Sequence, residues 1–176
     1  HGRTAFSRPH PYHDFHAEAF ARHAVERLAA KGCRKLMLLI GDDRTTNFRN
    51  LTTAFEAAAR QAGIAGEVRD NGLARRDPST MRALGLELAA RDDRPDGIVC
   101  DGEMQAIALV GGLLEGGLKP GEDIGLVYKQ TSGILPTLFP RVDSIQEDIL
   151  SAGGELTRLL LRRIAGEPVE QLQTLA

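Results

Sequence analysis

Short apolar runs alternate along the chain with longer segments in which apolar residues recur every three or four positions. Residues 35–40 are apolar on both faces, which is typical of a strand in the middle of a parallel sheet. Residues 97–100 form a second such run, and weaker strands are expected at 66–69 and 123–128. Helical spacing predicts helices between and before these runs, at 17–31, 47–62, 78–89 and 103–115. The alternation predicts an α/β fold with a doubly wound parallel sheet, that is, a Rossmann-like three-layer αβα arrangement.

The two ends of the chain fit a single self-sufficient domain poorly. Residues 1–16 contain Pro9 and Pro11 and are expected to be irregular. A long helix is expected to begin near 142–144 and to end at Gly166, and 168–172 is a candidate edge strand. Both ends would suit a chain that crosses between two lobes.

Polar turns follow three of the predicted strands, at 41–47, 101–103 and 129–133. The carboxyl ends of parallel strands meet at one edge of a sheet, and open α/β sheets bind their ligands at that edge. We therefore expect the three turns to converge and to form a crevice for a small molecule.

Composition narrows the classes of function. The chain has 176 residues, enough for one domain, and a net charge of −2, which gives no general attraction to nucleic acid or to an acidic membrane. No run is long enough to span a bilayer, and no signal-peptide pattern opens the chain, so a cytoplasmic protein is expected. The two cysteines, Cys33 and Cys100, lack CxxC spacing and are interpreted as reduced thiols.

Residues suited to catalysis or metal binding are sparse. His10, His13 and His16 recur every three positions, but the neighbouring prolines argue against a helix that would align them, so no metal site is predicted. The sequence has no nucleophile elbow, no GxGxxG after a strand and no P-loop. We expect neither an enzyme nor a bound cofactor.

Several segments, in this order and spacing, resemble the effector-binding domain of LacI/GalR-family transcriptional regulators: 24–35, 94–100, 113–127 and the crossing that opens with Val142-Asp143-Ser144-Ile145. The opening 1–4 and residues 129–131 are similar to a subgroup of α-glucoside-type regulators. The resemblance implies a periplasmic-binding-protein-like fold of two α/β lobes, with a sugar or sugar-like effector between them.

The resemblance also implies a division of the chain. Residues 1–16 correspond to an irregular remnant of the first lobe and a crossing, 17–140 to the second lobe, and 141–176 to the return crossing, the long helix and a terminal edge strand. A homodimer is implied, with the predicted helix 103–115 and residues 132–140 as its surfaces. Operator DNA would be bound only through a helix-turn-helix domain that this chain lacks, and no membrane partner is implied.

Sugar recognition needs planar bidentate groups, amides and carboxylates for hydroxyls, and an apolar face for the ring. By resemblance, a polar group meets the ligand where Arg3 stands, and an apolar wall stands at Phe15. From the residues alone, Arg3 is equally a flexible terminal side chain, and Phe15 a hydrophobic staple of the following helix.

The other candidates lie on the three turns. Asn47 is near a polar ligand position of the family and is also a candidate N-cap, whereas Arg49 is a candidate substitute for the arginine that many members carry where Leu51 stands. Asp101 is the first choice for a hydroxyl acceptor, with a helix cap as its alternative role. The full candidate set for ligand binding is Arg3, Phe15, Asn47, Arg49, Asp101, Glu103 and Gln130 (where many members carry Asp).

Two other functions remain open at this point. A periplasmic-type sugar-binding protein would share the lobes, although the almost wholly apolar helix 103–115 argues against a monomeric receptor. A small α/β enzyme acting on a sugar could use Asp101 and Glu103 as a general acid/base pair, without a visible nucleophile.

Overall fold

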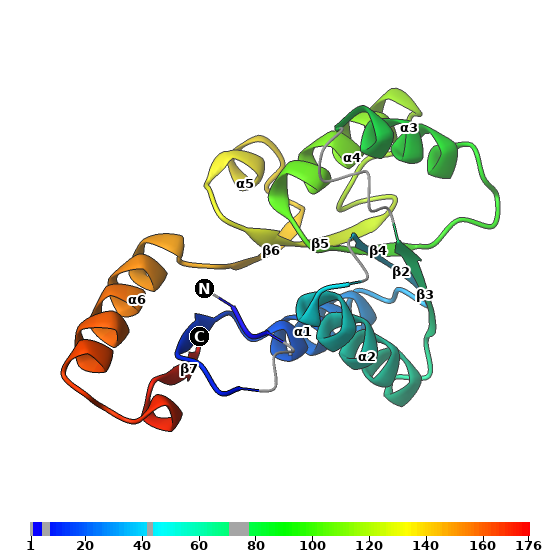
Figure 1. Ribbon diagram of the computed structural model, residues 1–176. Helices are drawn as coiled ribbons and strands as arrows, with labels where there is room; N and C mark the ends of the chain where they lie inside the picture. The colour runs from blue at the N-terminus through cyan, green and yellow to red at the C-terminus, as the bar shows by residue number, and fades with distance from the viewer. Residues whose placement is uncertain (1, 5–7, 42–43, 71–77) are drawn as a thin grey trace.

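The computed structural model describes residues 2–4, 8–41, 44–70 and 78–176 (Figure 1). Within them, the main sheet has five strands, all parallel, in the order β3-β2-β4-β5-β6. The first strand of this sheet, β2, lies inside it. The chain then moves to one edge at β3 and returns past β2 to β4, β5 and β6 at the other edge. This doubly wound topology confirms the predicted fold class. The strands are β2 (Lys35–Ile40), β3 (Ala65–Asp70), β4 (Gly97–Cys100), β5 (Gly125–Gln130) and β6 (Asp143–Gln146).

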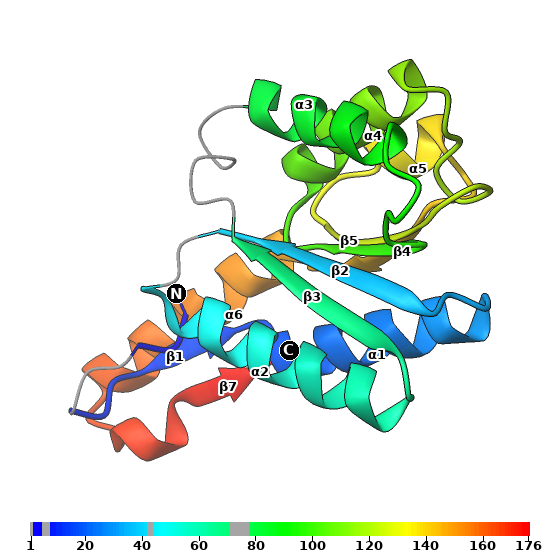
Figure 2. The same ribbon diagram turned by 90° about the vertical axis from the view of Figure 1, so that its right-hand side faces the viewer.

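Helices cover both faces of the main sheet, as Figure 2 shows. Side chains alternate between the two faces along each strand, so the core divides into two clusters. One cluster joins the sheet to α1 (Ala17–Ala30) and α2 (Thr46–Gln61). The other joins it to α3 (Pro78–Ala89), α4 (Glu103–Glu115) and the short α5 (Ile134–Leu138). The three layers predicted from the apolar spacing are therefore present.

A second, smaller unit lies beside α1 and contains both ends of the chain (Figure 1). Its parallel strands β1 (Tyr12–Asp14) and β7 (Gln173–Leu175) pair with each other, and α6 (Ile149–Ile164) packs nearby. The short 3₁₀ helix η1 (Val169–Gln171) precedes β7. The segment between β1 and α1 and the segment between β6 and α6 connect this unit to the main sheet.

The secondary structure predicted for the two ends was wrong in its bounds. Residues 12–14 are a strand inside the region expected to be irregular, and 168–172 contains η1, with the terminal strand following at 173–175. The long helix begins at Ile149, because 143–146 pairs with β5 as β6. These strands are short and are paired across long sequence separations, so they leave no local period in the sequence.

Smaller differences concern caps and strand ends. Thr45 caps α2 by accepting a hydrogen bond from the Phe48 amide at 3.1 Å, so Asn47 is not the N-cap. The N-cap of α4 is Gly102, without a side-chain cap bond, so Asp101 does not cap that helix. β3 extends one residue beyond its predicted range at each end, and β5 runs two residues further than predicted, which places Lys129 and Gln130 on the strand.

Candidate functional site

Side chains from the three predicted turns meet at the carboxyl edge of the main sheet. The Asn47 Nδ2 donates to Asp101 Oδ2 at 2.9 Å. The Lys129 ammonium lies 2.7 Å from Asp101 Oδ1 and donates to Asn47 Oδ1 at 3.4 Å. Asn47 follows β2 and Asp101 follows β4, so this cluster lies where the direction of strand order reverses, the usual ligand position in such sheets. The expected convergence of the turns is confirmed.

Lys129 is the centre of this polar cluster and is 7% exposed. Besides Asp101 and Asn47, its ammonium approaches Glu147 Oε1 at 3.5 Å. The same ammonium lies 5.2 Å from the centre of the Phe20 ring on α1, a cation–π distance. One buried cation is therefore shared between two carboxylates, one at the sheet edge and one on the segment that leads to α6.

Glu147 has a raised pKa. Burial is the main cause, and the negative charges of Asp101 and Asp14 add to it. The Lys129 ammonium lowers this pKa without outweighing the other effects. The negative charge of this carboxylate is thus poorly compensated by its neighbours.

A cavity of about 780 Å³ opens beside the cluster, between α1, α6 and the β1–β7 pair. Phe20 and Glu147 belong to its wall as well as to the environment of Lys129, so the cavity and the cluster are adjacent and share these two residues. Phe15 also lines the cavity, in the position expected of an apolar wall. Such a combination of aromatic wall and a few polar groups is typical of small-molecule sites.

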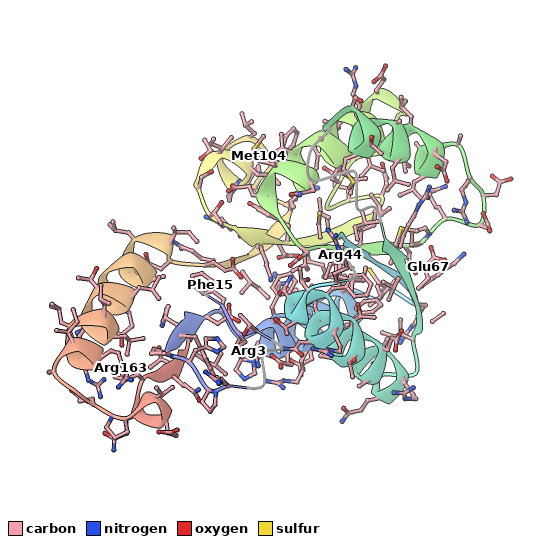
Figure 3. The ribbon with its side chains drawn as sticks, in the orientation of Figure 1. Arg3, Phe15, Arg44, Glu67, Met104 and Arg163 are labelled. Atoms are coloured by element: carbon pink, nitrogen blue, oxygen red, sulfur yellow. The ribbon has the colours of Figure 1, made fainter. Side chains whose placement is uncertain are left out.

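Arg3 reaches the same region from the N-terminal segment (Figure 3). Its guanidinium donates to both oxygens of Glu18, at 3.0 and 2.8 Å, and to Asp14 at 3.4 Å. The hydrogen bonds from Arg3 lower the pKa of Glu18 to about 2. Thr46, next to Asn47, donates to the Arg3 carbonyl at 2.5 Å. Arg3 is therefore fixed by carboxylates beside the cluster and is not a loose terminal side chain.

The side chains of Glu103 and Gln130 bond to other residues and do not contact the Lys129 cluster through any of these hydrogen bonds. Glu103 is buried and accepts four hydrogen bonds, of 2.7 to 3.1 Å, from the amides and hydroxyls of Thr131 and Ser132. Burial raises the pKa of Glu103, but these hydrogen bonds outweigh it and leave the pKa lowered. The Gln130 side chain accepts from the Ser144 hydroxyl. Glu103 thus holds the loop after β5 in place, whereas Gln130 links the end of β5 to β6. A carboxylate with a lowered pKa is also a poor general acid.

Arg49 is the last of the predicted ligand residues. Arg49 lies exposed on α2 and is not among the residues brought together around Lys129. Three residues of the site were not among the predicted ligand residues, namely Lys129, Glu147 and Phe20. Phe20 was predicted only as part of the apolar stripe of its helix, and a stripe alone does not separate a core residue from a cavity wall.

The described residues offer neither a metal site nor a membrane span. The part of the chain that the structure describes contains no group of three or more potential metal ligands among His, Cys, Asp and Glu. Among the same residues, no helix has both the length and the apolar character needed to cross a bilayer. Cys33 and Cys100 are buried free thiols, and burial raises the pKa of Cys100 to about 12.

The fold and the cavity define a class of protein: a periplasmic-binding-protein-like α/β protein with a pocket beside the crossing segments. A family model described as a periplasmic binding protein-like domain matches residues 25–175. The chain belongs to this family. No curated protein sequence matches the chain.

Solved structures with the same fold are similar over nearly the whole chain. A LacI-family regulatory protein from Chloroflexus aggregans has a TM-score of 0.86 and 24% identity, with 99% of this chain and 63% of that chain covered. The transcription regulator CcpA of Lactococcus lactis has a TM-score of 0.82 and 20% identity, with 94% and 60% covered. A putative ribose operon repressor from Burkholderia thailandensis has a TM-score of 0.75 and 21% identity, again with 94% and 60% covered. The chain thus spans less than two thirds of the length of these proteins.

Proposed function

We propose that this chain is the effector-binding and dimerisation part of a LacI-type transcriptional repressor that senses a sugar or sugar-like small molecule. The observation that carries the proposal is that the cavity lies next to the Lys129 cluster at the sheet edge and shares Glu147 and Phe20 with its surroundings. Solved structures of LacI-family regulators with the same fold support it. Operator DNA would be bound through a separate helix-turn-helix domain, and the protein would act in the cytoplasm. Kinship with the α-glucoside subgroup stays a prediction.

The division into lobes is part of this proposal. Residues 17–140 form the second lobe, and residues 1–16 and 141–176 contribute the crossings and a part of the first lobe. In support, the small unit has only two described strands, and α6 exposes large apolar side chains that an adjoining layer would cover: Leu150 (89% exposed), Leu160 (60%), Leu161 (62%) and Ile164 (74%).

The location of the cavity suggests how binding would be signalled. Its wall includes Phe20 from the main unit and Ser151 from α6, with Glu147 on the segment between them. A ligand held by both units favours one angle between the lobes over another. The difference in its affinity for the two arrangements sets how far the equilibrium moves, and a dimer passes the change to the DNA-binding domains.

The first test is binding. Mono- and disaccharides are screened by thermal shift, and a binder present at about 100 times its Kd should add about 2.7 kcal/mol of stability. Asp101→Asn is expected to weaken that binder at least about tenfold, since a charged hydrogen-bond acceptor is lost. Asp93→Asn, at a carboxylate whose side chain is 75% exposed, is the matched control and should leave the affinity unchanged. Absence of any saccharide-induced shift would contradict the proposed function.

Dimerisation is tested at an exposed apolar surface on α4 and α5. Met104, labelled in Figure 3, is 64% exposed, and Ile134 and Leu138 are 56% and 62% exposed. We propose that two copies associate through this surface, so the double variant Met104→Glu/Leu138→Glu should be monomeric in sedimentation equilibrium at micromolar concentration. Leu86→Glu, at a 36% exposed position on α3, should remain dimeric. A wild-type monomer, or a dimer that survives the double substitution, would refute this interface.

A further inference from the structure

Glu147 occupies a special position between the two units. It lies between β6 and α6, and its amide donates to the Gln130 carbonyl at 2.8 Å, which fixes the backbone against the end of β5. Its side chain is 17% exposed and lines the cavity. A carboxylate fixed in a cavity wall is able to meet a ligand without much reorganisation.

The charges around the cavity leave Glu147 with the weakest compensation. The Lys129 ammonium lies 2.7 Å from Asp101 Oδ1 but 3.5 Å from Glu147 Oε1, so it neutralises Asp101 more than Glu147. Arg3 is engaged by Glu18 and Asp14, as described above. Arg158, which also lines the cavity, is paired with Glu155.

The third carboxylate in the cavity wall is satisfied locally. Asp148 caps α6 and accepts hydrogen bonds from the amide and hydroxyl of Ser151, at 3.0 and 2.6 Å. Among the carboxylate side chains of the described residues that line the cavity, Glu147 is thus the one whose charge is least neutralised. Its raised pKa agrees with this ranking.

Two aromatic rings line the same cavity as this carboxylate. Phe15 and Phe20 both line the cavity, and the Phe20 ring already has the Lys129 ammonium at 5.2 Å. An aromatic face and a carboxylate together recognise ammonium groups, since the ring quadrupole and the negative charge both attract a cation. A neutral polyol would leave the excess negative charge of the cavity uncompensated.

We propose that the effector is a polyhydroxylated molecule with a protonated amine, and that Glu147 is the residue that binds the amine, with Phe15 and Phe20 as the wall beside it. This inference rests on the proposed function, because it assigns a chemical class to the ligand of the same cavity. The hydroxyl groups would meet the polar cluster of Asn47, Asp101 and Lys129, and the ammonium would supply the charge that Glu147 lacks.

The test compares three probes on the purified protein by isothermal titration calorimetry: glucosamine, glucose and N-acetylglucosamine. Glucosamine should bind at least about tenfold more tightly than either neutral sugar, since a hydrogen bond between charged groups is gained. N-acetylglucosamine removes the charge and keeps the nitrogen, so it separates charge from shape. Equal or tighter binding of a neutral sugar would overturn the inference and leave the proposed function standing. If none of the three probes binds, the inference fails, and the wider saccharide screen decides the proposed function separately.

Two variants locate the effect. Glu147→Gln should abolish the preference for glucosamine over glucose and N-acetylglucosamine. Glu155→Gln is the matched control, because Glu155 lines the same cavity but is paired with Arg158. It should retain the preference. An equal loss in both variants would show that the general negative field selects the amine, which would overturn the assignment to Glu147.

Discussion

Replacing Gly112 by alanine is expected to lower the free energy of unfolding by about 1–3 kcal/mol, the usual cost of overpacking a well-packed core. Gly112 lies buried on α4, and a methyl group there would overlap the Arg82 carbonyl oxygen on α3. Gly85 faces it from α3, where an added Cβ would lie 2.5 Å from the Leu109 carbonyl oxygen. Both obstacles are backbone atoms, so relief would require the two helices to move apart.

The adjacent Gly111 provides the control in the same helix turn. It is exposed, and an added Cβ would meet nothing within 4 Å. Gly111→Ala should therefore stabilise the protein by about 0.5–1 kcal/mol, because alanine loses less backbone entropy than glycine in a helix. Urea denaturation followed by circular dichroism measures both variants. Similar effects at the two positions would mean that α3 and α4 are not in close backbone contact.

The sequence predicted the parts of the fold that depend on burial of local patterns. Strands at 35–40 and 97–100 were found because both faces of a central parallel strand are apolar. The prediction that Asn47 and Asp101 lie close together rests on the same reasoning, since turns after neighbouring parallel strands share one edge of the sheet. No ligand is needed for this geometry, and ligand contact by these residues stays a prediction.

The smaller unit could not be predicted from local pattern. His13 on β1 contacts Thr174 on β7 at 2.9 Å, across 161 positions of sequence. Strands of three residues have no measurable period, and their pairing is decided by the whole fold. The same holds for β6, whose Asp143 and Ser144 look like the start of a helix until the pairing with β5 is known.

Lys129 lies on one of the three predicted turns, but its position at the centre of the cluster was not predicted. A lysine after an apolar run is usually the end of a strand, because a buried ammonium is costly without partners. Here the partners come from α2, from the turn after β4 and from the segment before α6, three regions far apart in sequence. Only the assembled fold shows that Lys129 is paired, and Glu147 becomes a candidate through the same contacts.

Replacing Lys129 by methionine is expected to lower the free energy of unfolding by about 3–5 kcal/mol, the usual cost of removing one partner of a buried ion pair. Methionine keeps much of the aliphatic volume, so packing against Phe20 is largely retained. What is lost is the positive charge between Asp101 and Glu147, which leaves two buried carboxylates without a shared cation. Lys119→Met, at an exposed lysine after α4, should change stability by less than about 0.5 kcal/mol in the same urea titration.

A double-mutant cycle separates the charge from the loss of a side chain. Asp101→Asn removes one of the two carboxylates, so combining it with Lys129→Met should cost clearly less than the sum of the single variants. The difference between sum and double variant measures the Asp101–Lys129 coupling and is expected to exceed about 1 kcal/mol for a pair with so little solvent contact. Strict additivity would mean that the Asp101–Lys129 pair makes no net contribution to stability. In that case Asp101 would hold its position through Asn47, and the ammonium would be available to a ligand instead of being occupied within the protein.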